Sequence, residues 1–501
     1  MVVGNPPYIR QELLTPYKPW LETHYDAFYG MADIYVYFYE LGVRLLKPGG
    51  LLSFIVTNKW MKAGYGEPLR RFFSEKAWVR SVVDFGHAKQ IFVEADVFPS
   101  IIVVQKPTEA PKPKTARLCT IPREQLRIDD LSTQIEREGF DISEDRLGKA
   151  TWNLERPAVT DLLAKIRSNG IPLKEFAKLR PLYGIKTGFN EAFLIPEEIR
   201  NRLVAEDRRS EEVVRPYLRG QDLGRWIPDW AHLWMIVLPS SNDRAWPWAN
   251  LGESAEVGFK TQYPSIYGHL KPLEEQLRKR QDQGKHWWEL RPCAYWQEFL
   301  RPKLCIQRIA FHSRIALDDT GMLLNDAAII LPTTDRWILA CLNSPTMWHF
   351  SFRFFPHKKD EALSMDIQYV ERLPIPKPSD SIRAAAENAV RRLIDITSQQ
   401  QQTQRALLDW LRVEYGIEKP SNKLLAATDL DSDTWVTEVK RIRGKKQPLT
   451  AACVQALRAE YTRTIDPALA LAAETCRGAI KTRKEQGLLP SPLPGLAGSF
   501  I

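Results

Sequence analysis

Residues 34–56, IYVYFYELGVRLLKPGGLLSFIV, decide the fold of the N-terminal region. The apolar segment 34–46 predicts a helix. Lys47-Pro48-Gly49-Gly50 follows it, a combination that ends a helix and starts a turn. The apolar run 51–56 predicts a buried strand, because continuous apolar runs of this length are typical of a parallel sheet covered on both faces.

Two more strands are expected nearby, at residues 78–85 and 100–104. Strands and helices alternate over residues 1–107, which predicts an α/β fold of the doubly wound, Rossmann-like type. Residues 107–114 contain three prolines and two lysines, and this composition predicts a linker. We therefore expect a first domain at residues 1–107.

The remainder of the chain divides into two further expected domains. Residues 115–378 are rich in Trp and Arg and predict an α+β domain with many short elements, ending at Leu373-Pro374-Ile375-Pro376-Lys377-Pro378. Residues 379–501 predict a helical region, with one helix from Ser381 to about Tyr415 and another over about 450–484. The glutamine run 399–402 is expected on a solvated helix face. Residues 488–501 are expected to be disordered.

The composition excludes several classes of protein. Of 501 residues 44% are hydrophobic and 26% charged, which excludes a wholly disordered or collagen-like chain. No apolar run reaches the roughly 18 residues of a membrane span, and the N-terminus does not resemble a secretory signal. Six scattered cysteines without a Cys-x-x-Cys pair indicate a reducing cytoplasm and no metal site. The net charge of +9 suits a polyanionic partner.

The stretch Asn5-Pro6-Pro7-Tyr8 carries the chemistry. It follows the apolar Val2-Val3-Gly4, so a strand end leads into a rigid turn whose prolines have fixed φ and no N–H donor. In such a turn the Asn5 amide oxygen and the Pro6 carbonyl can point the same way and accept both hydrogens of an exocyclic amine. Tyr8 adds an aromatic face. The alternative is a simple strand-to-loop turn, since Asn-Pro is a common turn starter.

These and other motifs together resemble a known family, the gamma-class DNA adenine-N6 methyltransferases of type II (IIG-like) restriction-modification systems with a TaqI-like specificity domain. The resemblance covers roughly residues 1–380, as the C-terminal part of such an enzyme. The ordered motifs that carry it are Asn5-Pro6-Pro7-Tyr8-Ile9-Arg10, residues 33–39 and 45–50, Val83-Asp84-Phe85-Gly86 with Phe92, Val97, Pro99 and Ser100, residues 183–193 and 215–220, Leu342-Asn343-Ser344-Pro345 and Leu373-Pro374-Ile375-Pro376.

The resemblance implies a mechanism. Such enzymes flip the target adenine out of the duplex. Asn5 and Pro6 would accept hydrogen bonds from its N6 amine and orient the nitrogen toward the methyl group of S-adenosylmethionine. Tyr8 would stack on the base, and Phe92 would close its other side. The alternative for Phe92 is an ordinary core residue beside Ile91 and Val93.

The resemblance also implies a DNA-reading domain over residues 115–378, with double-stranded DNA as the partner. Lys186, Arg215, Arg219 and Arg225 lie in loop-like segments and could reach phosphates or guanine edges. The tryptophans at 226, 230, 234, 246 and 248 are expected in a core or interface. The basic run 440–446 is either a phosphate contact or a solvated face.

The sequence departs from the family at the cofactor. A gamma-class enzyme carries a Phe-x-Gly-x-Gly turn upstream of its catalytic motif, whereas this chain starts in the strand directly before Asn5. The expected fold is thus a partial methyltransferase sheet without its cofactor half. We expect a truncated gene, a split gene with a separate N-terminal subunit, or a portion of a longer protein. We further expect the chain alone neither to bind S-adenosylmethionine well nor to methylate DNA.

Two other functions stay open at this point. The chain could be a non-catalytic DNA-specificity subunit that needs an N-terminal methyltransferase or nuclease partner. It could also be a fragment of a type IIG restriction endonuclease-methyltransferase. Asp429 or Asp431 with Glu438-Val439-Lys440 has the acidic-x-Lys form of a metal-dependent nuclease, although an exposed charged helix also accounts for these residues.

Overall fold

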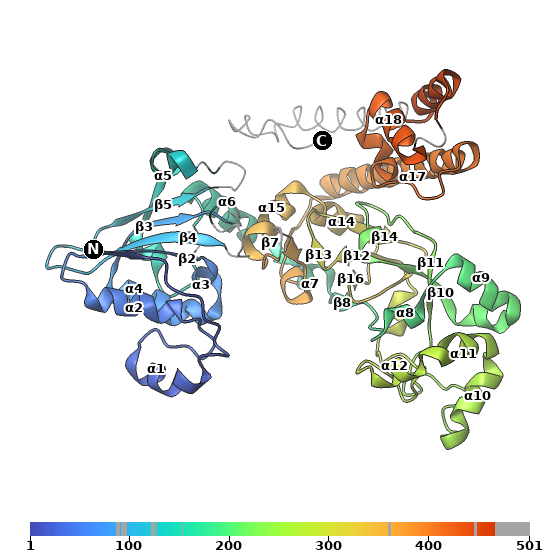
Figure 1. Ribbon diagram of the computed structural model, residues 1–501, viewed down its shortest axis with the longest axis horizontal. Coiled ribbons are helices and arrows are strands. Elements are labelled where there is room, and N and C mark those ends of the chain that lie inside the picture. Colours follow the sequence, from blue (N-terminus) through green and yellow to red (C-terminus); the bar gives the residue numbers. More distant parts are fainter. Residues whose placement is uncertain are drawn as a thin grey trace. The chain divides into compact units, whose positions relative to one another are not determined.

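The computed structural model describes residues 1–86, 91, 98–121, 126, 128–152, 154–358, 362–444 and 448–465, without the side chains of 426, 428 and 429 (Figure 1). The chain forms two compact units. The first is Met1–Asn169, and the second comprises Gly170–Lys358 with the residues from 362 onward. Among the described residues, no helix is both long and apolar enough to cross a bilayer.

A six-stranded sheet forms the first unit. Its strands are β1 (Val2–Gly4), β2 (Leu51–Thr57), β3 (Trp78–Asp84), β4 (Pro99–Gln105), β5 (Thr115–Thr120) and β6 (Phe140–Ser143), in the order β1-β2-β4-β3-β5-β6. The pairs β1/β2 and β3/β5 are parallel, while β4 runs antiparallel to both β2 and β3. The predicted strands at 51–56, 78–85 and 100–104 are confirmed, but the central pairs are not parallel.

Helices cover both faces of this sheet. On one face α2 (Tyr35–Leu45) and α4 (Glu67–Lys76) bury apolar side chains against β2, β3 and β4 (Figure 1). On the other face α5 (Leu131–Glu138) packs on the ends of β3 and β5. Helix α2 ends at Leu45, and Gly49 takes a φ of +78° in the turn that leads into β2. The predicted α/β fold is confirmed.

The first unit extends beyond the expected domain boundary at 107–114. Strand β5 lies after this segment and pairs with β3 from Ser81↔Arg117 to Asp84↔Thr120, and β6 pairs with β5. The sheet therefore continues through the Pro- and Lys-rich segment, and the two units divide at residue 169. Local composition correctly marks an exposed connection, but long-range strand pairing makes that connection internal to one sheet.

Short strands organise the second unit. One sheet has the order β15-β10-β11-β9 and another the order β14-β12-β16-β8. Their strands are β8 (Leu182–Tyr183), β9 (Leu194–Pro196), β10 (Val214–Leu218), β11 (Leu233–Ile236), β12 (Lys303–Gln307), β14 (Ile315–Asp318), β15 (Leu323–Leu324) and β16 (Ala328–Leu331). Two small pairs accompany them, β13 (Ile309–Ala310) with β17 (Leu363–Ser364) and β7 (Gly170–Pro172) with β18 (Pro374–Pro376). Further helices of this unit are α7 (Leu173–Ala177), α8 (Asn190–Phe193), α9 (Glu197–Glu206), α10 (Ala255–Gln262), α11 (Pro264–Leu270), α12 (Glu274–Lys279), α14 (Arg336–Leu342) and α15 (Pro345–Phe354).

The tryptophans that the sequence places in a core do pack there. Trp246 and Trp248 are buried and stack with ring centroids 4.6 Å apart, whereas Trp226, Trp230 and Trp234 are half-buried. The expectation of a core role for this group is thus confirmed for its two buried members.

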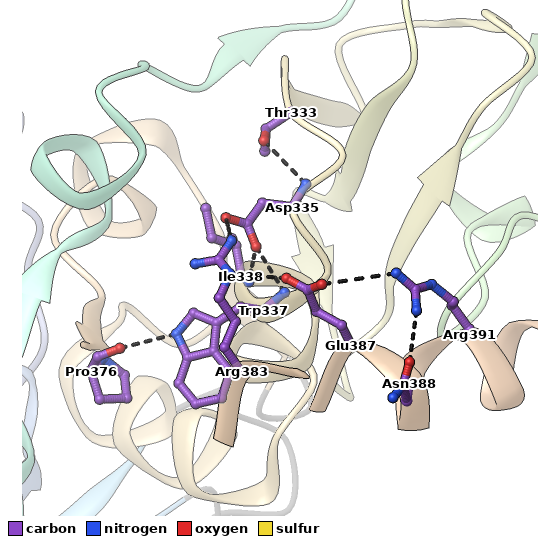
Figure 2. A network of polar contacts seen from close by, with 9 residues as sticks. All are labelled: Thr333, Asp335, Trp337, Ile338, Pro376, Arg383, Glu387, Asn388 and Arg391. Carbon is purple, nitrogen blue, oxygen red and sulfur yellow. Dashed lines mark hydrogen bonds and ion pairs between the residues drawn. The ribbon is translucent and has the colours of Figure 1, made fainter. Parts of the chain in front are cut away.

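A long helix, α17 (Asp380–Tyr415), begins beside α14 and confirms the predicted helix from 381 to 415. Figure 2 shows the polar contacts that attach it. The Asp335 carboxylate accepts hydrogen bonds from the first backbone N–H groups of α14 and from Arg383 Nη2, at 2.7 Å. Arg383 and Arg391 also pair with Glu387 on α17. Asp335 therefore both caps one helix and holds the next.

The end of α17 packs with α18 (Ser432–Arg443) and the helical residues 451–465 into a separate apolar cluster around Trp435. The glutamines at 399–402 are half-buried or exposed, and Gln401 donates a hydrogen bond to the Pro228 carbonyl. The expected disordered end at 488–501 lies outside the described residues.

Candidate functional site

Three strand ends meet at one edge of the first unit's sheet. Strand β1 is parallel to β2, and β2 and β3 share a direction because each is antiparallel to β4. The residues that follow these strands, Asn5, Asn58 and Asp84–Gly86, therefore lie at the same edge, where α/β sheets bind ligands. A hydrogen bond from Asn58 Nδ2 to Asp84 Oδ1, 2.9 Å long, joins two of them.

The turn after β1 is fixed by hydrogen bonds at Ile9, whereas the Asn5 side chain at its start has no hydrogen-bond partner among the described residues. Asp33 Oδ1 accepts the Ile9 N–H at 2.9 Å, and the Ile9 carbonyl accepts the Ile34 N–H at 3.2 Å. Pro6 is buried, whereas Asn5 is exposed and its amide makes no hydrogen bond to any residue that the structure describes. The Asn5 amide is thus a free acceptor on a fixed backbone.

Tyr8 is only partly available to a ligand. Its side chain is 39% exposed, its ring centroid lies 5.7 Å from that of Tyr35, and its hydroxyl contacts the backbone of Thr57 at the end of β2. Burial is the main cause that raises the pKa of the Tyr8 hydroxyl, and the charge of Asp33 adds to it. The phenol therefore stays protonated, and one side of its ring is covered by protein.

Phe92 lies outside the described residues. Among the described residues on either side of it, Gly86 donates its N–H to Asp84 Oδ1 and the Phe98 carbonyl accepts the Asn58 N–H at 2.7 Å. Both flanking residues are thus tied to Asn58 or Asp84. The role of Phe92 as a stacking residue stays a prediction.

Sequence reasoning missed Asn58 as a member of this site and named Asp84 only as part of a motif. Each is a polar residue at the end of an apolar strand, and that position was the available signal. Asp33 was quoted only as part of a motif. In the structure Asp33 fixes the turn at residues 5–9 by accepting the Ile9 N–H. Burial raises the pKa of the Asp33 carboxyl, although hydrogen bonds from the backbone of Ile9, Ile34 and Tyr35 oppose this shift.

The described residues do not form a complete cradle for S-adenosylmethionine. Strand β1 is the last strand of the sheet and has only β2 beside it among the residues described, and Val3 is 66% exposed there. The chain thus offers acceptors for an amine but no described Gly-rich turn next to them. No group of His, Cys, Asp or Glu in the described part of the chain could hold a metal ion.

The four expected DNA contacts differ in their surroundings. Lys186, Arg215 and Arg225 are exposed, on the loop after β8, on β10 and on the loop after β10. Arg219 instead binds the buried Asp222 through Nε at 3.1 Å and Nη2 at 2.7 Å, and this pairing raises its pKa. The Arg219 guanidinium is therefore engaged in an internal ion pair with Asp222.

The motif Leu342-Asn343-Ser344-Pro345 has a structural explanation. The buried Asn343 amide donates to the Ile315 carbonyl at 2.8 Å and accepts the Ile315 N–H at 3.1 Å, like a strand added beside β14. Ser344 then caps α15 by accepting the Met347 N–H, and Pro345 occupies the first turn. The motif joins two helices to the sheet.

The residues proposed as a nuclease site, Asp431 and Glu438, make hydrogen bonds and ion pairs within the chain. Asp431 caps α18 by accepting the Thr434 N–H at 2.8 Å. Glu438 is buried and bonds Arg441 and Ser421, which lowers the pKa of its carboxyl to about 2. The side chain of Asp429 lies outside the described residues. These contacts favour the alternative of a charged helix over a metal-dependent nuclease.

Comparison with known proteins gives three family matches. Residues 1–92 match the Eco57I restriction-modification methylase family, and residues 215–375 match the TaqI-like C-terminal specificity domain. Residues 379–477 match a domain of unknown function. The first two matches confirm the resemblance that the sequence motifs predict.

Curated relatives agree with these matches. The chain is 26% identical over 419 residues to the type II methyltransferase M.PaeR7I of Pseudomonas aeruginosa, covering 78% of this chain and 67% of the relative. It is 25% identical to the type II methyltransferase M.XhoI of Xanthomonas vasicola, covering 75% and 68%. It is 24% identical over 302 residues to the type II restriction enzyme and methyltransferase RM.Eco57I of Escherichia coli, which it covers to 28%. Among solved structures, the type IIL restriction-modification enzyme MmeI in complex with DNA matches 97% of this chain and 57% of its own, with 13% identity and a TM-score of 0.49.

Proposed function

We propose that this chain supplies the target-base site and the sequence-reading part of a DNA adenine-N6 methyltransferase of a restriction-modification system. The similarity to type II methyltransferases supports the reaction class and the DNA partner. One observation carries the choice of an amino group as the target: an unpaired amide, that of Asn5, sits on a proline-held turn at the edge where three strands end.

The proposed role of this turn is to hold the amine of a flipped adenine. The Asn5 side-chain oxygen accepts one N6 hydrogen and the Pro6 carbonyl accepts the other, which directs the nitrogen lone pair away from both acceptors. S-adenosylmethionine, when bound, supplies the methyl group. As the amine forms its new bond it gains positive charge, and fixed acceptors stabilise that charge without having to reorient. Tyr8 offers the exposed part of its ring to one face of the base.

Replacing Asn5 tests this proposal. In a preparation of the protein that methylates DNA, Asn5→Ala is expected to lower the turnover number by about 10² to 10³-fold and to leave the DNA dissociation constant unchanged. Methyl transfer is measured with tritiated S-adenosylmethionine, and digestion to nucleosides identifies the product. Asn250→Ala, which changes an exposed amide in the second unit, is the matched control. Methylated cytosine instead of N6-methyladenine, or full activity of Asn5→Ala, would contradict the proposal.

The source of the cofactor-binding residues is tested separately. The DNA directly upstream of the Met1 codon shows whether the reading frame continues to a Phe-x-Gly-x-Gly turn. The 501-residue chain by itself is assayed in parallel. Methyl transfer by this chain alone would refute our expectation that it needs further residues. If the chain binds DNA sequence-specifically but methylates none, either alone or together with any upstream-encoded residues, a specificity subunit that lacks catalysis is favoured.

A further inference from the structure

Residues 309–314 form an exposed apolar and basic projection on the second unit. Ile309 is 51% exposed and Phe311 is 55% exposed, while Ala310 between them and Ser313 after them are buried. His312 and Arg314 are also exposed. Ile309 lies on strand β13 and Phe311 directly follows that strand, so the two exposed apolar side chains flank the buried Ala310 and form a small contact surface.

This projection is firmly held. At its start Ile309 and Ala310 pair with β17. At its end the Ser313 hydroxyl donates to the Leu342 carbonyl at 2.7 Å, and Asn343 bonds both backbone groups of Ile315. Phe311 therefore stays exposed on a fixed backbone rather than folding into the nearby core.

The loop after β10 brings a second arginine beside it. Arg225 Nε donates to the Ser313 carbonyl at 3.2 Å. The next residue, Trp226, takes a φ of +83°, which is rare for a side chain of this size. Its N–H donates to the Ile315 carbonyl at 3.1 Å, and its carbonyl accepts the Leu317 N–H at 2.8 Å. Backbone strain of this kind is concentrated at functional sites.

The two arginines form a site of unbalanced positive charge. Although the Arg225 side chain is exposed, partial desolvation of its guanidinium and the neighbouring charge of Arg314 lower its pKa. Neither guanidinium forms an ion pair with a described residue, whereas nearby Arg308 pairs with Asp366 at 2.8 Å. Two adjacent cations without a carboxylate favour a polyanionic ligand.

Helix α17 supports this loop from within the same unit. Gln401 donates to the Pro228 carbonyl at 3.2 Å, and Arg405 pairs with Asp229 at 2.7 Å. The loop with Arg225 is thus held both by β14 and by the helix that opens the domain of unknown function.

We propose that residues 309–314 and Arg225 form a wedge for duplex DNA. Arg225 and Arg314 bind phosphates of the backbone, and Phe311, with Ile309 behind it, inserts between base pairs and unstacks them. This inference rests on the proposed function and adds to it the residues that distort the duplex. An apolar residue between cations fits DNA better than a protein partner, because it matches both the base stack and its flanking phosphates.

The test compares variants in binding to a duplex of about 30 base pairs that the wild-type chain selects from random sequences. Arg225→Ala with Arg314→Ala is expected to reduce the slope of log affinity against log salt by about 1.8, or 0.9 for each lost phosphate contact. Phe311→Ala is expected to weaken binding about 5- to 150-fold without changing the slope. It should also abolish the fluorescence rise of 2-aminopurine placed in the selected duplex.

Two variants serve as controls. Arg301→Ala removes an exposed arginine that pairs with Glu298, and Val413→Ala removes a 74% exposed apolar side chain on α17. All variants are first compared in thermal unfolding, so that a misfolded variant is recognised. If Phe311→Ala unfolds, Ile309→Ala together with the arginine variants keeps the test usable, because Ile309 is 51% exposed and its loss should also weaken duplex binding and reduce the 2-aminopurine signal.

The outcomes separate the two proposals. If the wild-type chain binds no duplex, the proposed function and the wedge both fail. If it binds but the Phe311 and arginine variants match the controls, the wedge is refuted and the proposed function stands. Unchanged DNA affinity together with lost self-association of Phe311→Ala in sedimentation would make this surface a protein interface, and would also overturn the wedge.

Discussion

The buried amide of Asn343 offers the sharpest test of how the second unit is built. Asn343→Ala removes the acceptor of the Ile315 N–H and one donor to the Ile315 carbonyl. The carbonyl keeps the Trp226 N–H as a partner, but the N–H of Ile315 is left without the acceptor that the structure gives it.

The expected cost follows from these contacts. An orphaned buried N–H costs about 1 to 3 kcal/mol, and the lost bond to the carbonyl adds about 1 kcal/mol. We therefore expect Asn343→Ala to lower the free energy of unfolding of this unit by about 2 to 4 kcal/mol. The Ser313 hydroxyl also loses a contact of 3.3 Å to the amide, so residues 313–315 should loosen most.

Two measurements check this expectation. Urea unfolding followed by tryptophan fluorescence gives the free energy, and amide hydrogen exchange reports Ile315 directly. The exposed Asn250→Ala is the control. The reasoning is refuted if the loss is below about 0.5 kcal/mol and the Ile315 amide exchanges as slowly as in the wild type.

Two further predictions concern residues quoted from the motifs. Gly184→Ala would bring a Cβ atom to 1.9 Å from the Asn325 carbonyl, so it should destabilise by more than about 2 kcal/mol, whereas Gly268→Ala has open space and should not; equal thermal midpoints would contradict this. Burial raises the pKa of Asp33 above its ordinary 3.8, so its contribution to stability is full below that value and is lost as pH rises through the folded pKa. Asp33→Asn keeps an acceptor for the Ile9 N–H, and its stability relative to wild type should therefore increase between pH 3.5 and pH 7 in chemical unfolding; a constant difference would be the contrary result.

The local elements of this protein were predictable because their signals are local. The helix of α2, its Pro-Gly-Gly stop and the strand β2 follow from apolar runs and turn residues within 23 positions. The long helix α17 likewise starts after a proline-rich segment and ends at Tyr415, directly before Gly416, which takes a φ of +66°. The turn at Asn5 could be proposed as a site because two prolines restrict the backbone whatever surrounds it.

Contacts between residues on separate elements could be found only in the tertiary structure. Residues 107–114 have the composition of a linker, but pairing of β5 with β3 makes them a connection between two strands of one sheet. Arg219 has the position of a DNA contact, but the buried Asp222 occupies its guanidinium. Composition and spacing describe how a segment behaves by itself. Which strand completes a sheet and which carboxylate neutralises a cation depend on groups that only folding brings together, and those decide where the free acceptor and the free positive charge remain.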